Sequence, residues 1–308
     1  MPKEKQSTLF LQGFLISIGG AILFSTKAIW VKLAFKNTGV DAITLLTLRM
    51  LLSLPFYIAA AWLAGKKENV EPLSNRDFGW IILLGVLGYY LSSLFDFIGL
   101  QYISAGLERL ILFLYPTFAV LLNTYLFKQK ITRIQLLALC ITYTGIGIAY
   151  YAELGTVQQN DSFYFGSFMV FLCAITYSFY LVGTGRMVIR AGSTRYTAYA
   201  MLAATAGIFL HFLVKQQWKT VNMSWELGWY SLALAIIATV IPSFMISAGM
   251  KRIGSNNTSI ITSIGPVSTI IQASIFLNEP ILITQILGTA LVIIGVILIG
   301  WQNNRIEH

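Results

Sequence analysis

An internal repeat constrains this chain more than any other feature of its sequence. Residues 92–151 align without a gap on residues 242–301, an offset of 150 residues. Identical residues meet in the pairs Ser93 and Ser243, Gly99 and Gly249, Pro116 and Pro266, Gln135 and Gln285, and Gly145 and Gly295. Both copies are apolar enough to span a lipid bilayer, so the repeat predicts two related sets of membrane helices.

The composition agrees with a membrane protein. Of the 308 residues, 56% are hydrophobic and only 11% are charged, against about 25% charged in soluble domains. The net charge of +9 would suggest nucleic acid in a soluble protein. Here the basic residues lie mostly in short loops between apolar runs, so they indicate orientation in the membrane, and we expect no nucleic-acid partner.

The chain divides into ten apolar segments, each near the roughly 20 residues that a helix needs to cross the hydrocarbon core. We therefore predict an all-α integral membrane protein with ten transmembrane helices. No connection is long enough to fold as a separate soluble domain. The predicted segments are 10–35, 42–64, 78–99, 105–127, 134–152, 164–184, 196–214, 227–248, 257–277 and 281–301.

The first two segments also repeat, with an offset of 153, so each half holds five helices. The matching pairs are Gly13 and Gly166, Ala21 and Ala174, Ser25 and Ser178, and Gly39 and Gly192. Because five is odd, helices that alternate across the membrane place the second half upside down. We therefore predict two inverted five-helix repeats, residues 1–152 and 153–308, that form one transport unit.

The loop charges test this topology. With the N-terminus inside, fourteen basic residues lie on the inner side: Lys3, Lys5, Lys66, Lys67, Arg76, Lys128, Lys130, Arg133, Arg186, Arg190, Arg195, Lys251, Arg252 and Arg305. Only Lys36, Lys215 and Lys219 lie in outer loops. The positive-inside rule then predicts that both termini are cytoplasmic.

Inverted repeats are a common plan among secondary transporters. In such proteins a site between the halves, near the midplane, is exposed alternately to the two sides. No GxxxxGK[ST] motif for nucleotide binding is present, and Cys140 and Cys173 lie in apolar runs without zinc-site spacing. We expect a transporter for a small polar metabolite, with no cofactor and no metal.

Several residues strengthen this interpretation. Ser25-Thr26 precedes Lys32 in the first helix, and the second helix holds Leu48-Arg49-Met50. The region from Gly249 to Gly295 holds a polar start, Gly265-Pro266 and Leu277-Asn278-Glu279. In order and spacing these features resemble the EamA family of the drug/metabolite transporter superfamily. The acidic residue that the family has after the fourth helix is Gln129 here.

The resemblance implies several further expectations. Helices 1, 3, 4, 6, 8 and 9 would line a central cavity, and helices 5 and 10 would lie at the periphery, where they often form a homodimer contact. The glycines of helices 5 and 10 equally suit packing within one protomer. The protein would lie in the cell inner membrane and export its substrate, either an amino acid-like molecule or an organic anion.

Charged residues within the predicted helices are the strongest candidates for the site. They are the cations Lys27, Lys32, Arg49 and Arg109 and the acids Asp96 and Glu108. Each costs roughly 2.5–3.5 kcal/mol to insert, so such residues usually pair or line a wet cavity. Lys27 lies about 12 Å from the outer end of its helix at 1.5 Å per residue.

These charges are not repeated in the second half. Lys27 aligns with Tyr180, Arg49 with Leu202, Asp96 with Ile246, and Glu108-Arg109 with Thr258-Ser259. The predicted site is thus asymmetric, ionic on one wall and rich in hydroxyl groups, including Thr262, on the other. Tyr177 and Tyr180 are the aromatic residues most expected to contact a substrate, because their helix mirrors the first.

Two readings of the charges remain open. In one, Lys27 and an arginine hold an anionic group, while Asp96 or Glu108 meets an amine or carries a coupling proton. In the other, a structural network such as Arg49 with Asp96 or Glu108 braces or gates the outer mouth. Glu108 and Arg109 are adjacent, so we expect them to have different partners, and Lys32 is expected to extend to the outer interface.

Pro116 and Pro266 interrupt helices at equivalent places, either as bending points or as static kinks. Two other functional classes fit the sequence less well. A receptor or accessory subunit with this fold would lack polar residues along the cavity, whereas this chain has many. An intramembrane enzyme would need a catalytic pair deep in the core, and His211 and Asp96 do not provide one.

Overall fold

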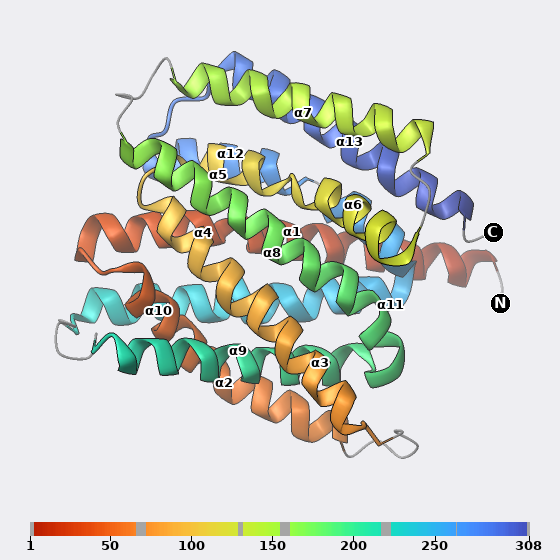
Figure 1. Ribbon diagram of the computed structural model, residues 1–308, viewed down its shortest axis with the longest axis horizontal. Coiled ribbons are helices and arrows are strands. Elements are labelled where there is room, and N and C mark those ends of the chain that lie inside the picture. Colours follow the sequence, from red (N-terminus) through yellow and green to blue (C-terminus); the bar gives the residue numbers. More distant parts are fainter. Residues whose placement is uncertain are drawn as a thin grey trace.

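The computed structural model describes residues 3–65, 72–128, 132–154, 161–216, 223–262 and 264–306. These residues form a bundle of long helices, with no strand within the described ranges (Figure 1). The first half of the chain contains α1 (Lys3–Thr38), α2 (Ala42–Gly65), α3 (Asn75–Gly85), η1 (Val86–Leu91), α4 (Ser92–Leu100), α5 (Ala105–Leu112), α6 (Tyr115–Phe127) and α7 (Arg133–Leu154).

The second half contains a matching series of helices. They are α8 (Asp161–Ala191), α9 (Ser193–Val214), α10 (Trp225–Ala235), η3 (Ile236–Val240), α11 (Ile241–Thr262), α12 (Gly265–Leu277) and α13 (Ile283–Ile306). Among the described residues, eight helical segments are long and apolar enough to cross a membrane, and two more apolar helices, Gly265–Leu277 and Ile283–Leu298, are shorter. The all-helical membrane fold is therefore confirmed, and the count of ten spans stays a prediction.

One predicted connection is helical instead. The sequence suggested a loop between residues 248 and 257, but α11 continues from Ile241 to Thr262. In the first half the chain does turn at the equivalent place, because the Ser104 side chain accepts a hydrogen bond from Leu107 N and so begins α5. Gly254 aligns with Ser104 and has no side chain to start a new helix.

Local features of the backbone repeat with the same offset as the sequence. The π-helices η1 and η3 begin at Val86 and Ile236. Ser74 and Ser224 cap the N-termini of α3 and α10, each accepting a backbone hydrogen bond. Lys128 and Asn278 end α6 and α12 in the left-handed conformation, with φ of 54° and 55°. The two halves therefore share local structure as well as sequence.

Reciprocal contacts join the two halves. Ser25 on α1 donates a hydrogen bond to Gly265 O at 3.1 Å, and Ser178 on α8 donates one to Tyr115 O at 2.9 Å. Gly265 and Tyr115 occupy equivalent positions of the repeat, so the first helix of each half contacts the other half at an equivalent point. In Figure 1, α1 and α8 run in opposite directions along the bundle.

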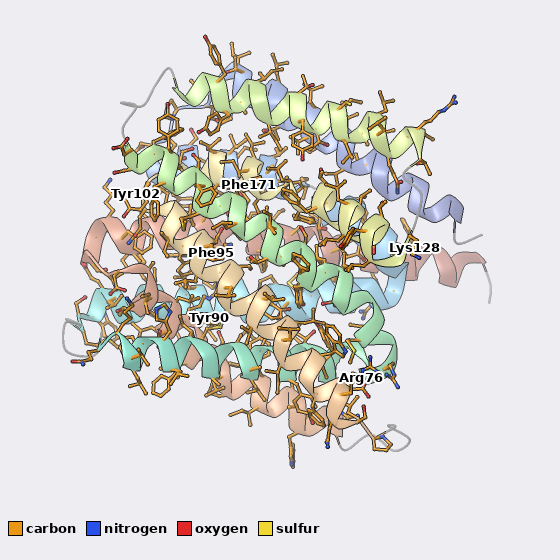
Figure 2. All side chains as sticks on the ribbon, viewed as in Figure 1. Arg76, Tyr90, Phe95, Tyr102, Lys128 and Phe171 are labelled. Carbon is orange, nitrogen blue, oxygen red and sulfur yellow. The ribbon has the colours of Figure 1, made fainter. Side chains whose placement is uncertain are left out.

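Both chain termini lie at one end of the bundle (Figure 1). Arg76 and Lys128 lie at that same end, and Tyr102 lies at the other (Figure 2). We call these the terminal end and the distal end. Pro116 and Pro266 stand in the first turns of α6 and α12, where a proline costs no helical hydrogen bond. Whether they act as bending points stays a prediction.

Helices α7 and α13 pack against each other within one protomer (Figure 1). A Cβ atom on Gly145 would lie 2.5 Å from Gly288 O, and one on Gly288 would lie 2.5 Å from Gly145 O. The glycines thus allow close approach of the backbones, which confirms packing within the protomer. The homodimer contact through the same helices stays a prediction.

Gly145→Val is expected to lower the free energy of unfolding by about 1–3 kcal/mol, because its side chain would overlap Gly288 O and Leu291 Cβ. Gly147→Val is the matched control, since a Cβ there meets nothing within 4 Å. Unfolding in a denaturing detergent, followed by circular dichroism, measures both. Equal loss in the two variants would contradict a tight α7–α13 contact.

Candidate functional site

A cluster of buried charges joins α1, α4 and α5. Lys27 Nζ lies 2.6 Å from Asp96 Oδ2 and 4.0 Å from Glu108 Oε1. Lys27 is 7% exposed, and both acids are fully buried. The structure therefore brings together three of the predicted site residues, which come from separate helices.

Local structure explains how these side chains meet. The Ser104 cap begins α5, so Glu108 falls in its first turn and Arg109 in its last. Asp96 lies on α4, which directly continues the π-helix η1. π-helical turns are rare and frequently occur at functional sites.

Arg109 extends this cluster to the second half of the chain. Its Nε atom lies 3.5 Å from Glu108 Oε2 and donates a hydrogen bond to Thr269 Oγ1 on α12 at 3.1 Å. Its Nη2 atom donates to Phe24 O on α1 at 3.2 Å. We call Lys27, Asp96, Glu108 and Arg109 the ionic cluster.

The ionic cluster corrects one prediction. Glu108 and Arg109 were expected to have different partners, yet their charged groups contact each other. Adjacent residues of a helix direct their Cβ atoms to different faces. The arginine side chain is long enough for its guanidinium to reach the Glu108 carboxylate all the same. Thr269 was not predicted either, because it is one of several hydroxyl residues in its segment, with Ser268 and Ser274, and the sequence does not distinguish it from them.

Arg49 lies outside the ionic cluster. Its Nη2 atom donates to Ser93 Oγ on α4 at 3.1 Å, and its guanidinium lies 5.0 Å from the centre of the Phe97 ring. Among the described residues it forms no direct ion pair, so the salt bridge that one reading gave it with Asp96 or Glu108 is not formed, although the Asp96 charge still acts on it. Both acids are instead held by Lys27 and Arg109.

Lys32 forms contacts that the sequence did not predict, and its extension to the outer interface stays a prediction. Its Nζ atom donates to Ile103 O at 2.7 Å and lies 3.4 Å from Glu279 Oε1. Both Glu279 oxygens accept from Ala105 N, each at 3.2 Å, at the start of α5. This latch, made of Lys32, Glu279, Ile103 and Ala105, ties α1 and the α4–α5 turn to the segment after α12. It lies at the distal end, beside Tyr102 (Figure 2).

Tyr177 and Tyr180 belong to an aromatic cluster, which sequence reasoning only partly foresaw. Tyr180 donates a hydrogen bond to Tyr89 at 2.7 Å, and the rings of Tyr177 and Tyr115 meet edge to face at 5.3 Å. Tyr180 also stacks on Tyr196, with ring centres 6.3 Å apart. Their predicted contact with substrate stays a prediction.

The predicted hydroxyl wall is only partly described. Thr258 is buried and Thr262 is half-buried on α11, while the side chain of Ser259 lies outside the described residues.

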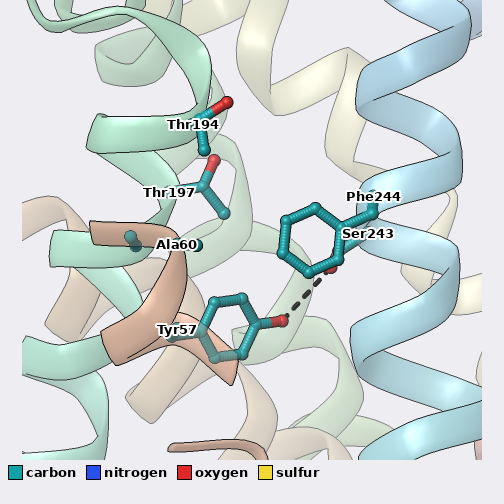
Figure 3. Close-up of a pocket in the computed structure, with 7 residues that line it drawn as sticks. Tyr57, Ala60, Thr194, Thr197, Ser243 and Phe244 are labelled. Atoms are coloured by element: carbon teal, nitrogen blue, oxygen red, sulfur yellow. Dashed lines mark hydrogen bonds between the residues drawn. The ribbon is translucent and has the colours of Figure 1, made fainter. Parts of the chain in front are cut away.

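A separate small cavity of about 10 Å³, room for about one water, lies between α2, α9 and α11. In it the hydroxyl groups of Tyr57 and Ser243 lie 3.2 Å apart (Figure 3).

The chain matches known proteins over most of its length. The model of the EamA-like transporter family matches residues 11–151 and again residues 164–301. The uncharacterized transporter YcbK of Bacillus subtilis is 32% identical over 94% of this chain and 93% of its own length. The uncharacterized transporter YyaM of the same organism is 28% identical over 70% of this chain and 71% of its own length.

A solved crystal structure shares the fold. It superposes with a TM-score of 0.67 at 19% identity, covering 96% of this chain and 99% of the other. At that identity the likeness concerns the fold alone. It shows that the arrangement of helices around the ionic cluster has a counterpart among experimental structures.

Proposed function

This chain belongs to the EamA-like transporter family and is a multi-pass membrane transporter, and we propose that it moves a small polar metabolite by alternating access. The substrate is an amino acid-like molecule or an organic anion, and the direction is export. The ionic cluster is the observation that carries this proposal. Buried intramembrane charges are costly and mark substrate or ion pathways.

The cluster has the chemistry for such a substrate. Lys27 and one arginine offer donors to a carboxylate, while Asp96 or Glu108 accepts from an amine or carries a coupling proton. In this conformation the cations and acids pair with one another and are buried, while the carboxylate oxygens of Asp96 and Glu108 have no hydrogen-bond partner among the described residues. A substrate therefore has to replace part of this pairing, and one half has to move away from the other to admit it.

Alternating access is supported by the relation between the halves. Reciprocal hydrogen bonds from Ser25 and Ser178, together with the opposite directions of α1 and α8, fit an inverted-topology repeat. Such repeats rock against each other around a site near the midplane. The latch made by Lys32 and Glu279 then acts as a gate at the distal end.

Orientation follows from the charges at the two ends. Arg76 and Lys128 lie at the terminal end with both termini (Figure 2). By the positive-inside rule this end faces the cytoplasm of a cell whose inner membrane holds the protein. The latch then closes the outer side, and export requires that it open.

Uptake into proteoliposomes tests the proposal. Labelled amino acids and organic acids are supplied under imposed pH and voltage gradients to wild type, Lys27→Ala and Lys36→Ala. We expect wild type to move at least one of them, Lys27→Ala to move it at least about fivefold more slowly, and Lys36→Ala to be unchanged. Lys36 is the matched control because it lies exposed on the same helix.

A receptor or accessory subunit on the same fold is the alternative. If wild type moves no member of the panel under any gradient, yet a member binds in a manner that depends on Lys27, the alternative holds. If uptake is equal in Lys27→Ala and Lys36→Ala, the ionic cluster is a structural brace and the site lies elsewhere.

A further inference from the structure

The charges in the protein core do not balance. The buried charged residues among those described are Lys27, Arg49, Asp77, Asp96, Glu108 and Arg109. Asp77 is paired with Arg190 and lies apart from the rest. Three cations then share two acids, which leaves an excess of one positive charge, and protonation of either acid increases that excess.

Arg49 is the cation of the three that has no direct ion pair among the described residues. Lys27 and Arg109 contact the two acids, whereas Arg49 contacts a hydroxyl and an aromatic ring and interacts with Asp96 only through the longer-range attraction of their charges. Its Nε–H is buried without a hydrogen-bond partner, and the residue is 4% exposed. A buried cation without a direct ion pair is costly, so a structural role explains this arrangement poorly.

Arg49 has no charged counterpart in the second half of the chain. Along α2, Arg49 contacts Ser93 and Tyr57 contacts Ser243, and these two serines are equivalent positions of the repeat. Each serine follows a π-helix, η1 or η3. The residues equivalent to Arg49 and Tyr57 on α9 are Leu202 and Leu210. The charged position is therefore specific to the first half.

We propose that Arg49, with Ser93 beside it, binds the anionic group of the transported molecule, which is a singly charged organic anion such as a carboxylate. This inference rests on the proposed transport function and selects between its two substrate classes. The guanidinium offers a planar pair of donors that fits a carboxylate. Binding of one anion brings the core to neutrality, whereas a zwitterion or a neutral amide leaves the excess charge in place.

Thermal unfolding of the purified full-length protein tests the site without transport. The variants are Arg49→Met, Arg49→Lys and the control Tyr57→Phe, which removes the contact to the repeat-equivalent serine without changing charge. Without added anions, we expect Arg49→Met to unfold at the same temperature as wild type or higher. A lower unfolding temperature for Arg49→Met, with Tyr57→Phe unchanged, would show a structural brace and overturn the proposal.

The same assay then measures binding of pyruvate and benzoate, with pyruvamide and benzamide as uncharged analogues and chloride as an inorganic anion. We expect a carboxylate, and not its amide, to stabilise wild type and Tyr57→Phe. Its apparent affinity should fall roughly tenfold or more in Arg49→Met and less in Arg49→Lys. Stabilisation by chloride alone, or no carboxylate effect that depends on Arg49, overturns the proposal.

Proteoliposome uptake separates this inference from the proposed function. If carboxylates bind through Arg49 and nothing is transported, the anion site stands and the transport proposal fails. If a solute is transported equally well by wild type and Arg49→Met, transport stands and the anion site is wrong.

Discussion

Asp96→Asn is expected to give a protein that unfolds far more readily and transports nothing. Asp96 is fully buried and lies 2.6 Å from the Lys27 ammonium group. Its loss leaves Lys27 with only Glu108, at 4.0 Å, which Arg109 also contacts. Removing one partner of a buried ion pair costs about 3–5 kcal/mol, because the remaining charge stays buried and unpaired. Thermal unfolding and proteoliposome uptake measure the two effects.

Two control variants distinguish loss of the Lys27–Asp96 ion pair from nonspecific destabilisation of the fold. The double variant Lys27→Met with Asp96→Leu removes both charges, so it should recover most of the stability while uptake stays absent. Asp77→Asn removes an acid whose partner Arg190 has a side chain 68% exposed and keeps an amide oxygen to accept from Ser74 N in the cap of α3, so its effect should stay near about 1 kcal/mol. Asp96→Asn with the unfolding temperature of wild type would show that the pair contributes little.

The helical architecture was largely predictable because the two halves of the chain repeat the same sequence pattern. Ser93 and Ser243, or Pro116 and Pro266, carry the same local structure wherever they occur, so an alignment of the chain with itself found the matching helices. Apolar length and loop charge then indicated membrane helices and a topology. The hydrogen bonds of Ser25 and Ser178 are equivalent contacts that the repeated residues make, each with the opposite half of the chain.

The pairing of charged side chains was less predictable. Sequence position shows how deep a residue lies in its helix, and it does not show which helix faces it. Lys27 was singled out as a site residue, but its pairing with Asp96 was not predicted. One reading paired Arg49 with an acid, whereas in the structure Lys27 and Arg109 contact both acids.

The latch was missed for a similar reason. Lys32 near a helix end fits the usual pattern of a lysine that extends to the interface. Its partner Glu279 is distant in the sequence and belongs to the other half. Only the packing of α1 beside α12 and the turn before α5 brings the two together.

Glu279→Gln is expected to raise the population of outward-open protein about 10- to 30-fold. Glu279 pairs with Lys32 and accepts from Ala105 N at the start of α5, where a negative charge is favoured by the helix dipole. Glutamine keeps the shape and removes the charge, so the closed state loses about 1.4–2 kcal/mol if the open state lacks these contacts. A loss of about 1.4 kcal/mol corresponds to a tenfold change in the equilibrium.

Hydrogen exchange of the α5 backbone amides, measured in nanodiscs, reports this opening. Ala105 N–H loses its charged acceptor directly, and amides further along α5 exchange faster only if the helix end separates from Glu279. Glu226→Gln is the matched control, since it changes an exposed acid in the first turn of α10. Lys32→Met should raise exchange as much as Glu279→Gln, and the double variant should add little, because both remove one contact. Unchanged exchange beyond Ala105 in both single variants would mean that the latch does not hold the distal end closed.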